Sequence, residues 1–116
     1  RKMREQLDQS NSELFDLKQG EGGIADIEFI VQYLVLRNAK RHPAVIHYSD
    51  NIRQLGTLAA ATCLPEKDVV RLQEAYKEYR LQLHRLALNE KPPLVPETEF
   101  TEERKLISEV WTRTMK

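Results

Sequence analysis

Cysteine, glycine and long apolar runs are all scarce in this 116-residue sequence. Its single cysteine, Cys63, excludes an intrachain disulfide, and we interpret this residue as a small apolar filler. No apolar run reaches the roughly 18 residues of a membrane span, and no signal peptide opens the chain, so we expect a cytoplasmic protein without a membrane partner. The 18 basic residues balance the 18 acidic ones, which argues against a nucleic-acid partner.

The remaining composition is that of an ordinary soluble domain. Hydrophobic residues make up 41% of the chain and charged residues 31%, which suits one domain with one modest core. The sequence opens in mid-pattern at Arg1 without an initiator methionine. We therefore expect a fragment that starts inside a helix.

Hydrophobic periodicity predicts an all-α fold, a bundle of four to five helices preceded by a short extended, glycine-rich junction. Helices are expected over residues 1–9, 24–38, about 50–62, 66–89 and from 101 onward. Ser49 and Thr101 are predicted helix caps, and Pro65 is predicted at a first helical position. Residues 14–18 alternate like a short strand, and the three prolines of residues 91–96 require an extended segment.

The helix predicted over residues 24–38 has polar groups on two opposed stripes. Glu28 and Gln32 share one stripe, whereas Asp26, Tyr33 and Arg37 share a nearly opposite one. The residues between them are apolar, which indicates a central helix with neighbours on several sides.

Residues 19–23 hold three of the four glycines and lead into that helix. Free backbone N–H groups at a helix start, with Lys18 beside them, could hold a phosphate. Neither the P-loop spacing nor the dinucleotide fingerprint is present, so a purely structural turn is the favoured alternative. Asp26 and Glu28 diverge by about 200° on a helix and cannot chelate one metal ion, and the three histidines lack ligand spacing.

A longer pattern carries a family resemblance. It runs Lys18-x-Gly20-x-Gly22-Gly23-Ile24-x-Asp26-Ile27-Glu28-Phe29-x-x-Gln32 and resembles the junction motif of glutamine-synthetase adenylyltransferases. Residues 32–37, 49–53, 84–88, Phe100, Glu103-Arg104 and Trp111 are similar as well, so the resemblance covers nearly the whole chain. It implies that residues 1–23 lead out of a missing nucleotidyltransferase domain and that residues 24–116 form the helical domain behind it, in the adenylylating half.

The resemblance also implies a division of chemistry. The intact parent would use ATP and Mg²⁺ held by a Gly-Ser and Asp-x-Asp pattern, and neither element occurs in this sequence. We therefore expect no catalytic residue, no metal ligand and no cofactor in the fragment, whereas the parent is a nucleotidyltransferase. The implied partners are glutamine synthetase, the PII signal protein and the preceding domain.

Seven residues are expected to support the active site of the parent from this junction: Lys18, Gly20, Gly22, Gly23, Asp26, Glu28 and Gln32. Asp16 receives no role, and Ala25 stands where many relatives have arginine. The implied function is that of an accessory domain in the adenylylation and deadenylylation of glutamine synthetase, which regulates nitrogen assimilation. The alternative is a non-catalytic helical interaction module whose glycine turn is only structural.

Overall fold

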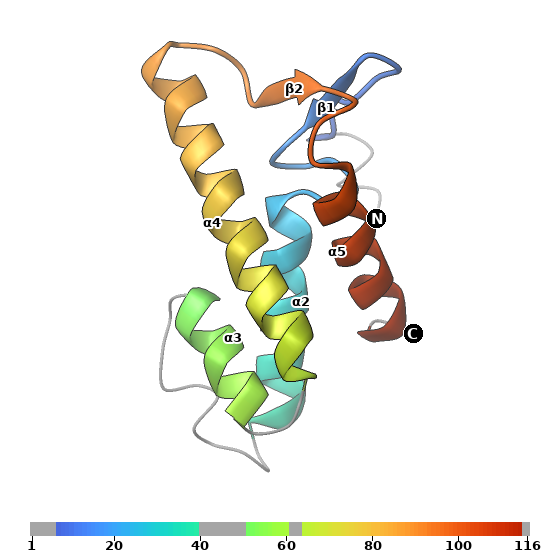
Figure 1. The fold of residues 1–116 in the computed structure, drawn as a ribbon, viewed down its shortest axis with the longest axis vertical. Helices are drawn as coiled ribbons and strands as arrows, with labels where there is room; N and C mark the ends of the chain where they lie inside the picture. The colour runs from blue at the N-terminus through green and yellow to red at the C-terminus, as the bar shows by residue number, and fades with distance from the viewer. Residues whose placement is uncertain (1–6, 40–50, 61–63, 115–116) are drawn as a thin grey trace.

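The computed structural model describes residues 7–39, 51–60 and 64–114 and forms a helical bundle with a two-stranded sheet at one end (Figure 1). In chain order the elements are β1 (Leu14–Asp16), α2 (Ile24–Asn38), α3 (Asn51–Ala60), α4 (Glu66–Leu88), β2 (Leu94–Pro96) and α5 (Thr101–Thr114). The predicted all-α class and bundle architecture are confirmed.

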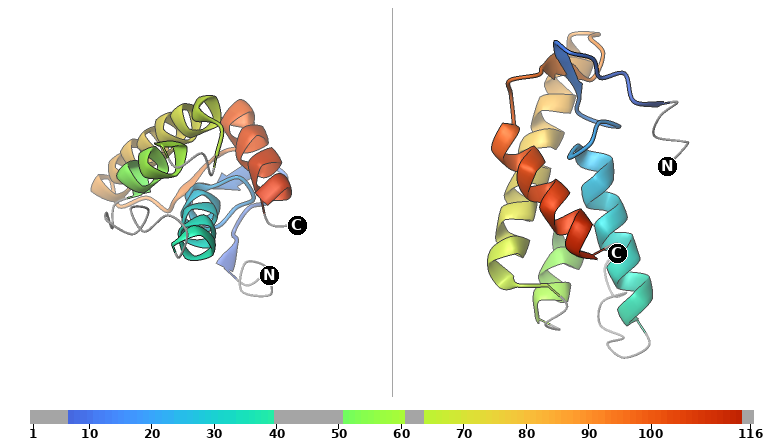
Figure 2. Two further views of the ribbon diagram at one scale, coloured as in Figure 1. Left: turned by 90° about the horizontal axis from the view of Figure 1, so that it is seen from below. Right: turned by 90° about the vertical axis from the view of Figure 1, so that its right-hand side faces the viewer.

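Helix α2 is the central element. It contacts α3, α4 and α5, and Figure 2 shows α3 and α4 side by side on one flank with α5 on another. Its inward face carries Ile27, Ile30, Val31 and Leu34, all less than one-tenth exposed, which follow the three- and four-residue steps of a helix face. The expected central position is confirmed.

The other helices close the core around it. Leu72 and Tyr79 of α4 are fully buried, as is Ile107 of α5. The start of α4 is joined to the end of α5 by an ion pair, in which the guanidinium of Arg113 lies 2.9 Å from the buried carboxylate of Asp68. Helices α4 and α5 are therefore held together by both apolar and charged contacts.

The small sheet joins segments that lie 80 residues apart. β1 and β2 are antiparallel, with Phe15 opposite Val95. Beyond the paired residues, Leu17 N–H donates to the carbonyl of Pro93 at 2.9 Å. Phe15 and Leu17 are buried in the same core as the helices, so the segment before α2 packs as part of the bundle.

The predicted boundaries agree closely with the structure. The helix expected over 24–38 matches α2 at both ends, and both extended segments are found as strands. Two cap predictions are wrong by one position. Pro65 occupies the N-cap position before α4, where its carbonyl accepts the N–H groups of Asp68 and Val69, and Thr101 is the first residue of α5 instead of its cap. The predictions for Ser49, Cys63, His42, His47 and residues 1–6 fall outside the described residues. Of the helix expected over residues 1–9, Leu7 is helical, whereas residues 8 and 9 are not.

Candidate functional site

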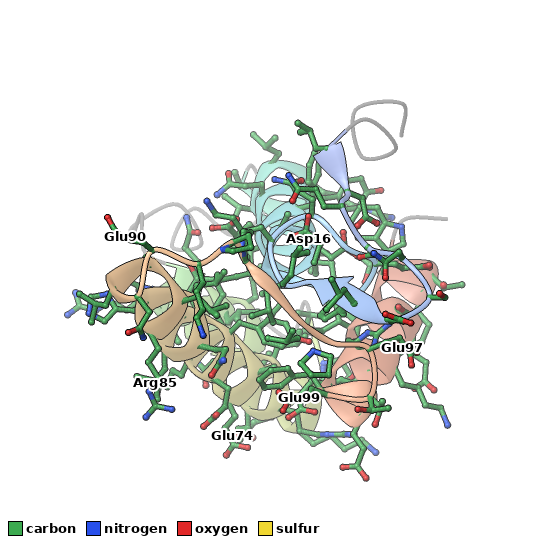
Figure 3. The ribbon with its side chains drawn as sticks, turned by 90° about the horizontal axis from the view of Figure 1, so that it is seen from above. Asp16, Glu74, Arg85, Glu90, Glu97 and Glu99 are labelled. Atoms are coloured by element: carbon green, nitrogen blue, oxygen red, sulfur yellow. The ribbon has the colours of Figure 1, made fainter. Side chains whose placement is uncertain are left out.

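The turn between β1 and α2 is organised by a buried carboxylate. Asp16 is 2% exposed and lies at the sheet end of the domain, where Figure 3 labels it. Its Oδ1 accepts the N–H groups of Lys18 and Gln19 at 2.9 and 3.0 Å, and its Oδ2 accepts that of Gln9 at 3.0 Å. This aspartate shapes the backbone on both sides of β1, since an aspartate that accepts the N–H groups two and three residues ahead stabilises a turn.

Gly22 is held at both of its backbone polar groups. Its N–H donates to Oδ2 of Asp26 at 2.9 Å, and its carbonyl accepts the hydroxyl of Tyr79 at 2.8 Å. The φ angle of +83° favours glycine, and a Cβ atom here would lie 2.8 Å from the backbone of Arg104. Helices α2, α4 and α5 thus converge on one residue of the turn.

Tyr79 is suited to this contact because it stays protonated. Burial raises the pKa of the Tyr79 hydroxyl above its usual value, the carboxylate of Glu103 raises it further, and Arg104 lowers it. The neutral hydroxyl remains a hydrogen-bond donor to Gly22 across the physiological range. The Tyr79 ring meets the edge of Phe100 at 5.2 Å between centroids, which fixes its orientation.

Arg104 closes the turn from the side of α5. Its guanidinium carbon lies 4.0 Å from the centroid of the Phe15 ring, and Nη1 donates to the carbonyl of Glu97 at 2.7 Å. The cation over the ring joins α5 to β1, and the hydrogen bond joins it to the residue that follows β2. The side chain therefore connects the residues before α2 with those after α4.

The backbone of the turn leaves little room for an anion. The N–H groups of residues 18–20 and 22–26 all donate to acceptors within the domain. Gly20 and Gly23 are also enclosed, because a Cβ atom at either would lie within 2.6 Å of a carbonyl oxygen of Asp16 or Leu17. A phosphate nest requires N–H groups that point at the ligand, so this backbone does not fit a phosphate.

The structure divides the seven predicted support residues into two groups. Gly20, Gly22, Gly23 and Asp26 are buried in the turn, whereas Lys18, Glu28 and Gln32 are exposed. Their shared role at an active site stays a prediction. Glu28 is within 3.4 Å of the Tyr76 hydroxyl, a long contact that leaves its carboxylate accessible.

Three residues that organise the turn were not assigned to it from the sequence. Asp16 was given no role, Tyr79 was not singled out, and Arg104 was noted only for the family resemblance. The one signal available was an aspartate three residues before the glycine-rich segment of residues 19–23, because aspartate favours turns. The other two contacts come from residues more than 50 positions away in the chain.

Elsewhere, the described residues contain a groove of about 470 Å³ between α4 and α5. Its lining includes Glu74, Glu78, Glu102 and Glu103 together with Arg71 and Lys77. No group of three or more histidine, cysteine, aspartate or glutamate side chains in the described part of the chain is placed to hold a metal ion. Within the same residues, none of the helices combines the length and apolarity needed to span a bilayer.

Sequence comparisons place this fold and turn in a known family. The model of the family described as GlnD PII-uridylyltransferase matches residues 1–93, and the chain belongs to this family. The bifunctional glutamine synthetase adenylyltransferase/adenylyl-removing enzyme of Nitrosococcus oceani is 48% identical over 111 residues, which cover 96% of this chain. The enzyme of the same name from Thioalkalivibrio sulfidiphilus is 46% identical over 101 residues, 87% of this chain.

The resemblance predicted from the glycine-rich motif is therefore confirmed. The chain spans only 12% and 10% of the lengths of these two relatives. The family model ends at Pro93, so β2 and α5 lie beyond the match although both pack on the core.

Proposed function

We propose that this chain is a helical accessory domain of a longer enzyme that adenylylates and deadenylylates glutamine synthetase and so regulates nitrogen assimilation. The observation that carries the proposal is the 48% identity, over nearly the whole chain, to a relative named for both activities. Because the chain corresponds to about a tenth of that relative, the activity belongs to the longer polypeptide.

In this proposal the transfer chemistry lies in a separate nucleotidyltransferase domain. The Gly-Ser and Asp-x-Asp pattern that would hold Mg²⁺ and ATP is missing from this sequence, and the backbone of the glycine turn does not fit a phosphate. ATP and Mg²⁺ are therefore assigned to the other domain. The PII signal protein is proposed as a further partner of the full-length enzyme. The full-length enzyme is also proposed to be cytoplasmic.

The turn would serve the neighbouring domain through its exposed residues. The buried group, Gly20, Gly22, Gly23 and Asp26, holds the shape of the turn. Lys18 and Glu28 project from that framework into solvent, so they are accessible to a second domain. Because the backbone of the turn is already fixed by these contacts, an exposed side chain on it loses less conformational entropy when it contacts a second domain.

The rival proposal is a helical interaction module in which the turn is only structural. One observation favours it: the backbone N–H groups of the turn donate hydrogen bonds to acceptors within the domain. The two proposals differ in what they expect when an exposed side chain of the turn is removed.

The decisive experiment measures incorporation of labelled AMP from ATP into glutamine synthetase in the presence of Mg²⁺. We expect transfer by the full-length enzyme and none by the 116-residue chain alone. Lys18→Ala in the full-length enzyme should lower the rate tenfold or more, equivalent to about 1.4 kcal/mol in the transition state.

A matched control is Lys67→Ala, which removes another exposed lysine at the start of α4, far from the turn (Figure 1). This variant should retain the full rate, and both variants should unfold within about 0.5 kcal/mol of the parent. Full activity of the Lys18 variant would leave the turn structural and favour the interaction module. Turnover by the isolated chain would refute the proposed division of labour.

A further inference from the structure

The outward face of α2 is apolar where a surface helix would be polar. Phe29 is 64% exposed and Leu36 is 79% exposed, although both are large hydrophobic residues. At about 100° per residue, Phe29, Gln32 and Leu36 lie within a sector of about 60°, directly opposite the buried face of Ile27 and Leu34. We call this sector the outer stripe of α2.

Helix α5 extends the outer stripe sideways. The half-buried ring of Trp111 meets Phe29 edge-to-face, with 6.0 Å between centroids. Charged residues border the stripe, with the exposed Glu28 along one edge and the exposed Arg37 along the other. An apolar centre with a polar rim is the usual layout of a protein interface.

The exposed apolar side chains of the stripe supply only part of the area that a stable complex between separate chains uses. An aromatic side chain buries 150–250 Å² in full, so the exposed part of Phe29 contributes on the order of 100–160 Å². A standard interface needs about 800 Å² from each partner. A tethered partner needs much less, since a linker supplies an effective concentration in the millimolar range.

The length of the relatives agrees with a tethered partner. The relatives carry about nine-tenths of their length outside the matched region. A longer polypeptide of this kind therefore contains further domains, any of which is a candidate occupant of the outer stripe.

We infer that the outer stripe of α2, with Trp111, is the docking surface for another folded domain of the same polypeptide. That domain presents an apolar ridge to Phe29 and Leu36, a basic side chain toward Glu28 and an acidic one toward Arg37. The inference rests on the proposed function, because it requires the longer enzyme. The contact is intramolecular, so it forms at any protein concentration.

The test compares two leucines of similar exposure in the full-length enzyme. Leu36→Cys places a thiol in the outer stripe, and Leu88→Cys places one at the end of α4, where Leu88 is 71% exposed. Each variant is labelled with a maleimide, and peptide-resolved mass spectrometry gives the rate at the new thiol relative to its rate in denaturant. Gln32→Cys provides a second position in the stripe with a polar parent residue.

We expect the relative labelling rates of the Leu36 and Gln32 variants to be at least tenfold lower than that of the Leu88 variant, independently of protein concentration. Equal rates would overturn the docking surface. Protection that disappears on tenfold dilution would also overturn it, because the occupant would then be a second copy. AMP transfer by the unsubstituted full-length enzyme, measured in parallel, separates the two ideas. Activity with an unprotected stripe refutes only the docking surface, and protection without activity refutes only the proposed function.

Discussion

Replacing Asp16 with asparagine tests whether the buried carboxylate organises the turn. The side chains have nearly the same shape, so no cavity forms, but an amide offers one acceptor oxygen instead of two. If the amide oxygen keeps the N–H groups of Lys18 and Gln19, the amide nitrogen faces the N–H of Gln9, which then loses its acceptor. One lost hydrogen bond to a charged group costs about 1.5–3 kcal/mol, and the two retained bonds weaken when the charge is removed. We expect Asp16→Asn to destabilise the chain by about 2–4 kcal/mol.

Urea unfolding of the 116-residue chain, followed by circular dichroism, measures this change. Asp8→Asn is the matched control, because Asp8 accepts a single exposed N–H, that of Ser10, at 2.8 Å. Its cost should stay within about 0.5 kcal/mol. A cost for Asp16→Asn as small as that of the control would show that water replaces the three hydrogen bonds, and the account of the turn would be wrong.

Four further variants test the bundle and the turn by the same unfolding measurement. Leu34→Asp would bury an unpaired charge in α2 and should lower the free energy of unfolding by several kcal/mol. An unchanged free energy of unfolding would mean that α2 is peripheral. Gly22→Ala should cost at least about 2 kcal/mol because of its positive φ and the approach of Arg104. Gly56→Ala is the control and should stabilise α3 by about 0.5–1 kcal/mol, because its Cβ would meet only Gln73 Nε2 at 3.7 Å. A change of the same sign in the free energy of unfolding of both variants would contradict this. Tyr79→Phe should cost about 1–2 kcal/mol at neutral pH. Because the folded-state pKa of Tyr79 is raised, its contribution is complete below about pH 10 and is lost as the pH rises further, so the difference between parent and variant should shrink there; a constant difference would refute the assignment.

The helices could be predicted because their signals are local. Ile24–Asn38 has an uninterrupted apolar repeat between a glycine cluster and a charged segment, and both of its ends were predicted correctly. Pro65 was misplaced by one position, since proline is compatible with the N-cap as well as with the first helical residue. The extended character of residues 94–96 followed from proline alone, but their pairing with β1 did not.

The contacts that shape the turn could not be predicted because their partners are distant in sequence. Tyr79 lies 57 residues from Gly22, and its position in α4 carries no information about where its hydroxyl points. Asp16 was overlooked for a different reason, since its burial results from the strand pairing and not from its neighbours in the chain. The family motif identified the glycines and Asp26, but only the structure shows that the backbone groups of Gly22 are both occupied.

The pairing of β1 with β2 has a consequence for the order in which the protein forms during synthesis. Residues 14–16 leave the ribosome long before residues 94–96, so the first strand waits for about 80 residues before its partner exists. Contacts of such sequence separation close a large loop and form slowly. Helices α2, α3 and α4 can associate in the meantime, because their contacts need nothing beyond Leu88. The glycine turn, although it comes early in the chain, is completed only when Arg104 arrives from α5, so the junction is among the last parts of the domain to mature.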